Sequence, residues 1–290
     1  MTQRISPIIK PKELLSLKDK SNIVLVDARA GKDAQEQYSN VHLEGSLFVD
    51  LNTQLANIKL DPAIGGRHPL PSPTQFAQVI TQLGITPDDY VVVYDDQNGS
   101  NAAARFWWML KSAGHNKVQV LDGGLDAALK VGFKTSSNEE TPLNTETYKI
   151  SKWLLPLADI DEVTKVADDR KFLVIDVRDK VRYDGDKEPI DLIAGHIPGA
   201  VNIPFTSNLD ADGSYLPSSE LSDKYLKALD GRKIENVIVH CGSGVTACHT
   251  ILAMAYAGIE FPKLYVGSWS EWSRNDRPIA TKEEGQSTRN

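Results

Sequence analysis

One pattern of segments occurs twice along the chain, in the same order. Each copy contains short apolar, β-branched runs that alternate with segments of helical spacing. The matching pairs are 23–29 with 172–178, 42–49 with 196–203, 91–95 with 237–241, 103–114 with 247–258, and 118–124 with 263–269. A repeat of this length indicates a duplicated domain rather than a solenoid. The chain of 290 residues is long enough for two such domains.

Short strands that alternate with amphipathic helices favour the α/β class, with a mainly parallel sheet flanked by helices in each half. The segment between the halves is rich in Ser, Thr, Asn, Glu and Pro, which is typical of a linker. We therefore predict a first domain over 1–135, a linker over 136–156 and a second domain over 157–290.

The charge and the apolar runs of the chain exclude some kinds of partner. The formal net charge of −7 argues against binding to nucleic acid or to an anionic membrane. No apolar run approaches the roughly 18 residues of a membrane-spanning helix. The first residues contain no apolar signal core. We expect a cytoplasmic protein with no nucleic-acid partner and no membrane partner.

The strongest indication of chemistry is a cysteine at the end of a predicted strand. The apolar run Val237–His240 leads into Cys241, and a Gly-rich loop over 242–246 separates this cysteine from an apolar segment of helical spacing. Glycines allow a tight loop whose N–H groups turn inward, and the next helix adds its positive end. Both effects stabilise a thiolate, so Cys241 is a candidate nucleophile. The alternative is a cysteine buried for packing.

Two other kinds of cysteine site do not fit. Cysteine-dependent phosphatases close a similar loop with an arginine, but position 247 is Ala and the loop carries no charged residue. The two cysteines of the chain, Cys241 and Cys248, have a spacing that suits neither a disulfide nor a zinc site. We expect no metal and no organic cofactor, and we expect Cys248 to be a buried helix residue.

The first half has Asp95 at the position that matches Cys241. An acidic loop has no nucleophilic thiol and repels anions, so the first domain is expected to be catalytically silent. In the alternative interpretation, Asp95 and Asp96 cap the helix that follows them.

Over nearly its whole length the chain resembles the tandem-domain rhodanese family of sulfurtransferases. The motifs that carry this resemblance are Asp27-Ala-Arg29, Gly66-Arg-His-Pro-Leu-Pro71, Trp107-Trp-Met-Leu110 and Leu121-Asp-Gly-Gly124 in the first half, and Asp176-Val-Arg178, Gly195-His-Ile-Pro-Gly-Ala200, Cys241-Gly-Ser-Gly-Val-Thr-Ala247 and Gly267-Ser-Trp-Ser-Glu-Trp272 in the second. The resemblance implies two rhodanese-like domains, of which the second carries the reactive cysteine. The loop after Cys241 is most similar to that of the 3-mercaptopyruvate sulfurtransferase branch.

The resemblance also implies a substrate site around Cys241. The loop residues that would bind the donor and hold the transferred sulfur are Gly242, Ser243, Gly244, Val245 and Thr246. Arg182 matches an arginine that binds the donor's carboxylate, and His68 matches a first-domain histidine that reaches the site. The alternatives are a solvated helix arginine and a loop histidine. Relatives often carry a second arginine where this chain has Asp191, so either one arginine suffices or another, such as Arg67, takes its place.

The implied activity is a sulfurtransferase that moves sulfane sulfur from 3-mercaptopyruvate through a Cys241 persulfide. The acceptor would be a thiol, cyanide or a thioredoxin-like protein. Two alternatives stay open: a thiosulfate:cyanide sulfurtransferase, and a persulfide carrier that is not an enzyme. Arg182 favours a small donor with a carboxylate over the carrier.

Overall fold

The computed structural model describes residues 5–17, 22–142 and 146–282, which fall into two compact units. Unit 1 lies within 1–57, 70–155 and 210–215, and unit 2 lies within 58–69, 156–209 and 216–290. Each unit therefore contains one short segment from the other half of the sequence. The division at 1–135, 136–156 and 157–290 stays a prediction, to which the structure adds these two exchanged segments. Residues 143–145 of the predicted linker lie outside the described residues.

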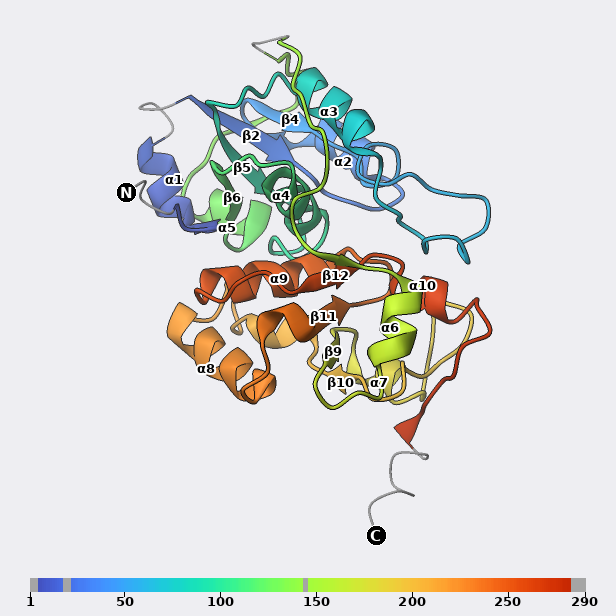
Figure 1. The fold of residues 1–290 in the computed structure, drawn as a ribbon. Helices are drawn as coiled ribbons and strands as arrows, with labels where there is room; N and C mark the ends of the chain where they lie inside the picture. The colour runs from blue at the N-terminus through green and yellow to red at the C-terminus, as the bar shows by residue number, and fades with distance from the viewer. Residues whose placement is uncertain (1–4, 18–21, 143–145, 283–290) are drawn as a thin grey trace. The chain divides into compact units, whose positions relative to one another are not determined.

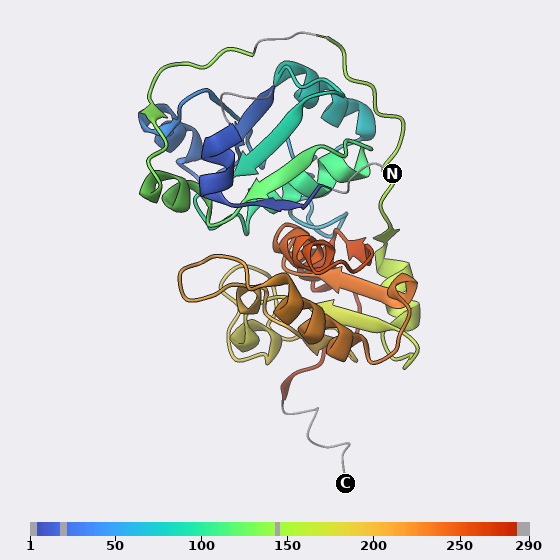
Figure 2. The same cartoon turned by 90° about the vertical axis from the view of Figure 1, so that its left-hand side faces the viewer.

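Each unit has a sheet of its own, and both sheets consist of five parallel strands in equivalent order (Figure 2). The order in unit 1 is β1 (Ile8–Ile9), β6 (Val118–Leu121), β5 (Tyr90–Tyr94), β2 (Ile23–Asp27) and β4 (Ser46–Phe48). The order in unit 2 is β8 (Leu157–Ala158), β12 (Lys263–Tyr265), β11 (Val237–His240), β9 (Leu173–Asp176) and β10 (Val201–Asn202). In unit 1, β3 (His42–Leu43) also pairs with β7 (Thr135–Ser136) in the antiparallel direction.

Helices cover both faces of each sheet (Figure 1). In unit 1, α1 (Pro11–Leu17) and α5 (Gly124–Lys130) pack on one face, α3 (Pro73–Gln82) and α4 (Ala102–Ser112) cover the other, and α2 (Ala34–Asn40) follows β2. In unit 2, α6 (Ile160–Val166) and α10 (Ser268–Trp272) cover one face, and α8 (Ser218–Leu229) and α9 (Thr246–Tyr256) cover the other. The short helices α7 (Lys180–Tyr183), η1 (Phe205–Asn208) and η2 (Ile234–Asn236) lie in connections.

Local sequence explains these elements. Val91, Val92 and Val93 of β5 are all buried, because helices cover both faces of a parallel sheet. Helix α3 begins at Pro73 with a capping box in which Ser72 and Gln75 satisfy each other's backbone N–H groups. The predicted α/β class with a mainly parallel sheet in each half is confirmed.

This fold places Cys241 directly after β11, the central strand of the sheet in unit 2. In open α/β sheets, ligands bind at the carboxyl ends of the strands, next to the loops that lead into helices. Asp95 has the same position after β5 in unit 1. None of the helices in the described part of the chain is long and apolar enough to cross a membrane.

Candidate active site

The loop after β11 surrounds the sulfur of Cys241. This residue is only 2% exposed, and the backbone N–H of Gly244 donates a hydrogen bond to its Sγ at 3.1 Å. Gly244 has φ +73°, and a Cβ there would lie 2.6 Å from the carbonyl oxygen of Val266. Glycine is therefore required at this position, for its backbone conformation and for space. An N–H donor at Sγ stabilises negative charge on the sulfur.

Helix α10 holds the loop in place. The N–H of Trp269 donates to the carbonyl oxygen of Cys241 at 3.0 Å, and the N–H of Ser270 donates to that of Gly242 at 2.9 Å. The N–H of Cys241 donates to the hydroxyl of Ser268 at 3.2 Å. These bonds satisfy the backbone polar groups of a buried loop and keep the sulfur in one position. The predicted loop residues Val245 and Thr246 lie where α9 begins.

A cluster of four arginines and three carboxylates lies beside this loop. We define the arginine cluster as the residues joined by ion pairs in unit 2, namely Arg67, Arg178, Arg182, Arg274, Asp176, Glu188 and Asp191. The buried Asp191 pairs with Arg67 at 2.9 Å, Arg182 at 3.0 Å and Arg274 at 3.3 Å. Glu188 pairs with Arg182 at 2.8 Å. The cluster touches the cysteine loop, because a Cβ on Gly242 would lie 3.0 Å from Nη2 of Arg67 and 3.5 Å from Nη2 of Arg182.

The arginine cluster carries an excess of one positive charge, since four guanidinium groups face three carboxylates. Burial acts to lower the pKa of Arg182, but hydrogen bonding to Glu188 and the charges of Glu188, Asp191 and Cys241 outweigh burial and raise it above its usual value. Arg182 therefore stays charged at any pH at which the protein works. A positive site next to Cys241 suits an anionic substrate.

Within the cluster, Arg178 and Asp176 form an ion pair at 2.6 Å. Arg29 and Asp27 repeat it in unit 1, also at 2.6 Å. Both pairs are buried, and both arginines follow their aspartates by two residues at the end of a strand. Because the pair also occurs in the unit without the cysteine, its role is to tie loops together.

The segment 58–69 brings a histidine to the cysteine loop. Nδ1 of His68 lies 2.8 Å from the hydroxyl oxygen of Ser243, within hydrogen-bond distance. The segment is held on α10, because the N–H of Gly65 donates to Glu271 at 2.8 Å and the N–H of Arg67 donates to Ser270 at 3.0 Å. A hydroxyl paired with an imidazole can polarise a carbonyl group and help to move a proton.

A model of the rhodanese-like domain matches the chain twice, over residues 10–130 and 159–275. The chain belongs to the rhodanese-like domain family. This confirms the predicted family and the two duplicated rhodanese-like domains. The chain also has relatives that are named as sulfurtransferases, which confirms the predicted enzyme class.

The rhodanese-like relatives cover most of the chain. A protein of Pseudomonas aeruginosa named "Probable 3-mercaptopyruvate sulfurtransferase" is 39% identical, over 84% of this chain and 86% of its own. The "Thiosulfate/3-mercaptopyruvate sulfurtransferase 2" of Arabidopsis thaliana is 36% identical, over 82% of this chain and 74% of its own. The solved structure of the 3-mercaptopyruvate sulfurtransferase from Leishmania major superposes with a TM-score of 0.80 at 29% identity, over 92% of this chain and 74% of that one.

The two rhodanese-like units differ in what fills the loop after the central strand. In unit 1 the carboxylate of Asp95 is fully buried and accepts hydrogen bonds from four backbone N–H groups. The donors are Gln97 at 2.9 Å, Gly99 at 2.7 Å, Asn101 at 3.0 Å and Ala103 at 3.1 Å. Burial raises the pKa of Asp95 to about 6, although these N–H groups oppose the shift. The carboxylate of Asp95 thus satisfies N–H groups of its own loop and of the first turn of α4, as the alternative interpretation of this residue as a helix cap expects.

Replacing Asp95 by alanine is expected to loosen this loop, because four buried N–H groups lose their acceptor. In Asp95→Ala we expect the free energy of local opening of this loop to fall by about 2–3 kcal/mol. Amide exchange over residues 97–103 should then be roughly 100-fold faster. Hydrogen exchange with mass spectrometry measures this. The control is Asp96→Ala, since one carboxylate oxygen of Asp96 is buried and accepts no hydrogen bond from the residues that the structure describes. Equal exchange in the two variants would contradict the assignment.

The structure brings together most of the predicted site. Gly244 is hydrogen-bonded to Cys241, and His68 is within hydrogen-bond distance of Ser243. Arg182 lies beside Gly242 of the same loop. Sequence reasoning noted Asp191 as a departure from the family and Arg67 as a possible substitute, but it did not predict that both join one cluster. It missed Arg274 entirely, because nothing in its local pattern distinguishes it from a solvated arginine.

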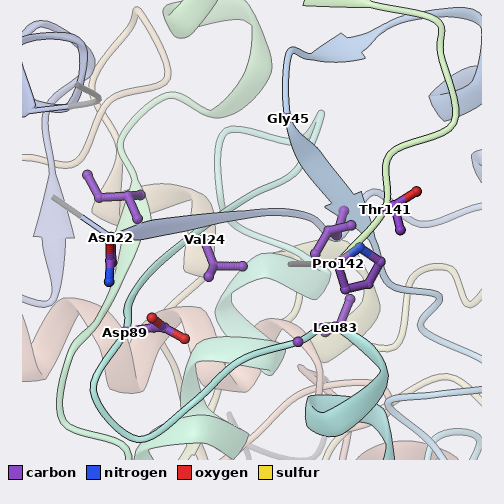
Figure 3. A pocket seen from close by; sticks show the side chains of 10 residues that line it. Asn22, Val24, Gly45, Leu83, Asp89, Thr141 and Pro142 are labelled. Atoms are coloured by element: carbon purple, nitrogen blue, oxygen red, sulfur yellow. The ribbon is translucent and has the colours of Figure 1, made fainter. Parts of the chain in front are cut away.

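A separate cavity of about 270 Å³ lies in unit 1 and has a different character (Figure 3). Asn22, Val24, Leu83, Asp89 and Pro142 are among the residues that line it. Asp89 is the one ionisable residue of the lining, and its carboxylate already accepts hydrogen bonds from the N–H and the hydroxyl of Thr86.

Proposed function

We propose that the chain is an enzyme that transfers sulfur from 3-mercaptopyruvate through a persulfide on Cys241. The observation that carries the proposal is the hydrogen bond from Gly244 N–H to Cys241 Sγ, in a loop that also touches two guanidinium groups. The hydrogen bond to Sγ favours a thiolate, and the two guanidinium groups favour a donor with a carboxylate. The names of the Pseudomonas and Leishmania relatives support the same donor.

In the first half-reaction, the Cys241 thiolate attacks the donor's sulfur. An S–S bond forms while the donor's C–S bond breaks, and the electron pair of that bond goes to carbon as the enolate of pyruvate. The thiol proton of the donor balances the proton that this carbon takes up. The products are pyruvate and the Cys241 persulfide anion.

In the second half-reaction, a nucleophilic acceptor attacks the outer sulfur of the persulfide. A thiol acceptor passes its proton to the persulfide and forms a new S–S bond, whereas cyanide forms a C–S bond and leaves as thiocyanate. In both cases the bond from the outer sulfur to Cys241 breaks, and the Cys241 thiolate leaves. The acceptor would be a small thiol, cyanide or a thioredoxin-like protein. The proposal includes a cytoplasmic location, where reduced thiols are abundant.

Ser243 and His68 would act on the donor's carbonyl group. The Ser243 hydroxyl, paired with His68 at 2.8 Å, can donate a hydrogen bond to a carbonyl oxygen as it becomes an enolate. His68 can accept the Ser243 proton or return it, and so help carry a proton to the carbon that leaves.

We expect Ser243→Ala and His68→Ala each to lower kcat with 3-mercaptopyruvate by about 10²-fold, as does the loss of one oxyanion donor elsewhere. The double variant is expected to lose little more than either single variant, because the two side chains act as one unit. Steady-state kinetics of the three variants measures this. Ser273→Ala is the control, since the Ser273 hydroxyl is buried without a hydrogen bond among the described residues. Losses that add up in the double variant would contradict a shared role.

Steady-state assays with 3-mercaptopyruvate and with thiosulfate test the proposed donor. We expect a higher kcat/KM for 3-mercaptopyruvate. A higher value for thiosulfate would favour the alternative, a thiosulfate sulfurtransferase. The positive charge of the arginine cluster and the name of the Arabidopsis relative are also compatible with that alternative. Absence of turnover with both donors would favour a persulfide carrier loaded by another protein.

A further inference from the structure

His240 is a buried imidazole next to the nucleophile, and the steps proposed above do not use it. It is the last residue of β11, it precedes Cys241, and it is fully buried. Its Nδ1 lies 3.2 Å from the carbonyl oxygen of Cys241, which also accepts the N–H of Trp269. Its Nε2 makes no hydrogen bond in the described part of the chain. A buried polar nitrogen without a partner destabilises a fold, so its presence calls for an explanation.

The unused nitrogen of His240 lies near the carboxylate of Asp176. The two residues are direct neighbours in the parallel pairing of β11 with β9, and Nε2 is 3.8 Å from Oδ2 of Asp176, which is beyond hydrogen-bond distance. Burial acts to raise the pKa of Asp176, but the positive charges of a protonated His240 and of Arg178 outweigh burial and lower it. The ring of Tyr265 on β12 also packs near the imidazole, with 6.2 Å between centroids, and burial raises its pKa, so it stays neutral. Each ring nitrogen of His240 therefore has one oxygen atom nearby, and one of the two oxygens is charged.

Only an imidazolium, with a proton on each nitrogen, suits both oxygen atoms. A neutral ring with its proton on Nδ1 donates to the Cys241 carbonyl but leaves a lone pair near Asp176, and the other tautomer leaves a lone pair near the carbonyl. Burial opposes the cation and lowers the pKa of His240 below its usual value, although Asp176 acts to raise it. The positive charges of Arg178 and His196 also act to lower it. His240 is therefore neutral at neutral pH, and a proton added in acid would satisfy its unused nitrogen.

Unit 1 fills the same position with a residue that needs no further partner. Tyr94 ends β5 as His240 ends β11, and it pairs with Asp27 in the equivalent register. The Tyr94 hydroxyl lies 2.7 Å from that of Ser46 and accepts the N–H of Leu43 at 3.0 Å. Burial raises the pKa of Tyr94, so this side chain carries no charge. The fold therefore does not require a histidine at this position, and of the two units the one with the reactive cysteine has the imidazole.

We propose that His240 is a positioning residue for Cys241, and that its imidazole takes up a proton between the Cys241 carbonyl oxygen and Asp176. This inference rests on the proposed role of Cys241 as the nucleophile. The proton comes from water, and only hydrogen bonds change: the bond to the carbonyl becomes charge-assisted, and a second one forms to Asp176 after a small movement of the ring. The imidazolium then holds the start of the cysteine loop more firmly and adds a positive charge beside the thiol. A nearby positive charge favours the thiolate, so Cys241 stays ionised to lower pH.

The competing explanation is that His240 only fills space in the core of unit 2. His196 provides the matched control, because it is also a buried histidine of unit 2 whose Nδ1 lies near a backbone carbonyl oxygen, that of Tyr183 at 2.7 Å. Burial lowers the pKa of His196 too, against hydrogen bonding to Tyr183 and the charge of Asp176. The carbonyl that His196 contacts is not part of the cysteine loop. A role confined to packing would make the two histidines equivalent.

The first test compares His240→Asn with His196→Asn. An asparagine amide can donate from about the position of Nδ1, but it takes up no proton. The rate of iodoacetamide alkylation of the Cys241 peptide is measured by mass spectrometry at about pH 5.5 and at about pH 8.5. In His240→Asn we expect the rate at the lower pH to fall by about 5-fold, with the rate at the higher pH changed less than about 2-fold, because only the protonated imidazole is lost.

In His196→Asn we expect both alkylation rates to stay within about 2-fold of those of the unaltered protein. A loss of the positioning hydrogen bond or of packing alone would lower the rate of His240→Asn equally at both pH values. That result, or the same pH profile in the two variants, would overturn the proposal.

The second test needs no change at His240. The ring resonances of His240 are followed by NMR between about pH 5 and about pH 8, in the unaltered protein and in Cys241→Ser. Because coupling between two sites is reciprocal, a thiolate that gains from the imidazolium also stabilises it. We expect the midpoint of the His240 titration to be lower in Cys241→Ser by about 0.7 pH unit, which is the same factor of about 5.

Absence of a His240 titration in this range, or equal midpoints in the two proteins, would contradict the proposed proton uptake. Neither alkylation nor NMR needs a sulfur donor. Both measurements therefore test His240 even if the unaltered enzyme fails to use 3-mercaptopyruvate, which is the result that contradicts the proposed function.

Discussion

Cys241→Ser is expected to abolish sulfur transfer from every donor, with a loss of at least about 10⁴-fold in kcat. A serine hydroxyl at this position cannot form a persulfide, and it is far less ionised than a thiol near neutral pH. The loop itself would remain, because α10 holds it through the backbone of Cys241 and Gly242. Transfer is measured as pyruvate release from 3-mercaptopyruvate with a thiol acceptor.

Cys248→Ser is the matched control for this loss. Cys248 is fully buried in α9, and its Sγ donates to the carbonyl oxygen of Gly244 at 3.3 Å. A serine hydroxyl can make the same hydrogen bond, so we expect kcat to stay within about 3-fold of the unaltered enzyme. Substantial transfer by Cys241→Ser, or a complete loss in Cys248→Ser, would move the nucleophile away from Cys241.

Arg182→Ala is expected to lower kcat/KM for 3-mercaptopyruvate by about 2–4 kcal/mol, which is roughly 30- to 800-fold. The change removes a guanidinium that lies beside Gly242 and leaves the buried Glu188 and Asp191 with one partner fewer. Steady-state kinetics with a thermal melt of the same variant measures both consequences. We expect the loss of activity to be larger than the fraction of enzyme that the lower melting temperature would leave unfolded at the assay temperature.

Arg232→Ala controls for the loss of a positive charge elsewhere in unit 2. Arg232 pairs with the exposed Asp230 at 3.7 Å and donates to the backbone, and it is not part of the arginine cluster. Its replacement is expected to leave kcat/KM within about 2-fold, since an exposed ion pair contributes little. An unchanged kcat/KM in Arg182→Ala would remove Arg182 from the donor site and, with it, the case for a carboxylate donor.

Much of the fold could be predicted from the sequence because the signals are local. The β-branched run Val237–His240 and the glycines after Cys241 indicate a buried strand and a tight loop without reference to the rest of the chain. The duplication then assigns the same elements to both halves. Asp95 and Cys241, at matching positions of the two halves, are the basis of the prediction that the first domain is silent and the second one reactive.

The arginine cluster could not be predicted in this way, because it depends on contacts between distant residues. Arg67 and Asp191 are 124 positions apart in the sequence, and no local pattern links them. Their contact requires the segment 58–69 to pack in unit 2, where Gly66 approaches Gly267 so closely that a Cβ would collide with its carbonyl oxygen. A family resemblance indicated only that position 191 is unusual, since it compares residues one at a time.

The exchanged segment has a consequence for any shortened protein. A fragment that begins at residue 156 contains Cys241 but lacks Arg67 and His68. It would leave Ser243 and Asp191 without these two partners.

The most direct measurement of the account is the mass of the Cys241 peptide after reaction with 3-mercaptopyruvate in the absence of an acceptor. The account predicts that the peptide gains one sulfur atom in step with the release of one pyruvate per chain, and that cyanide removes this sulfur again. Pyruvate release without added sulfur on Cys241, or added sulfur on the peptide of Cys248 instead, would contradict the account.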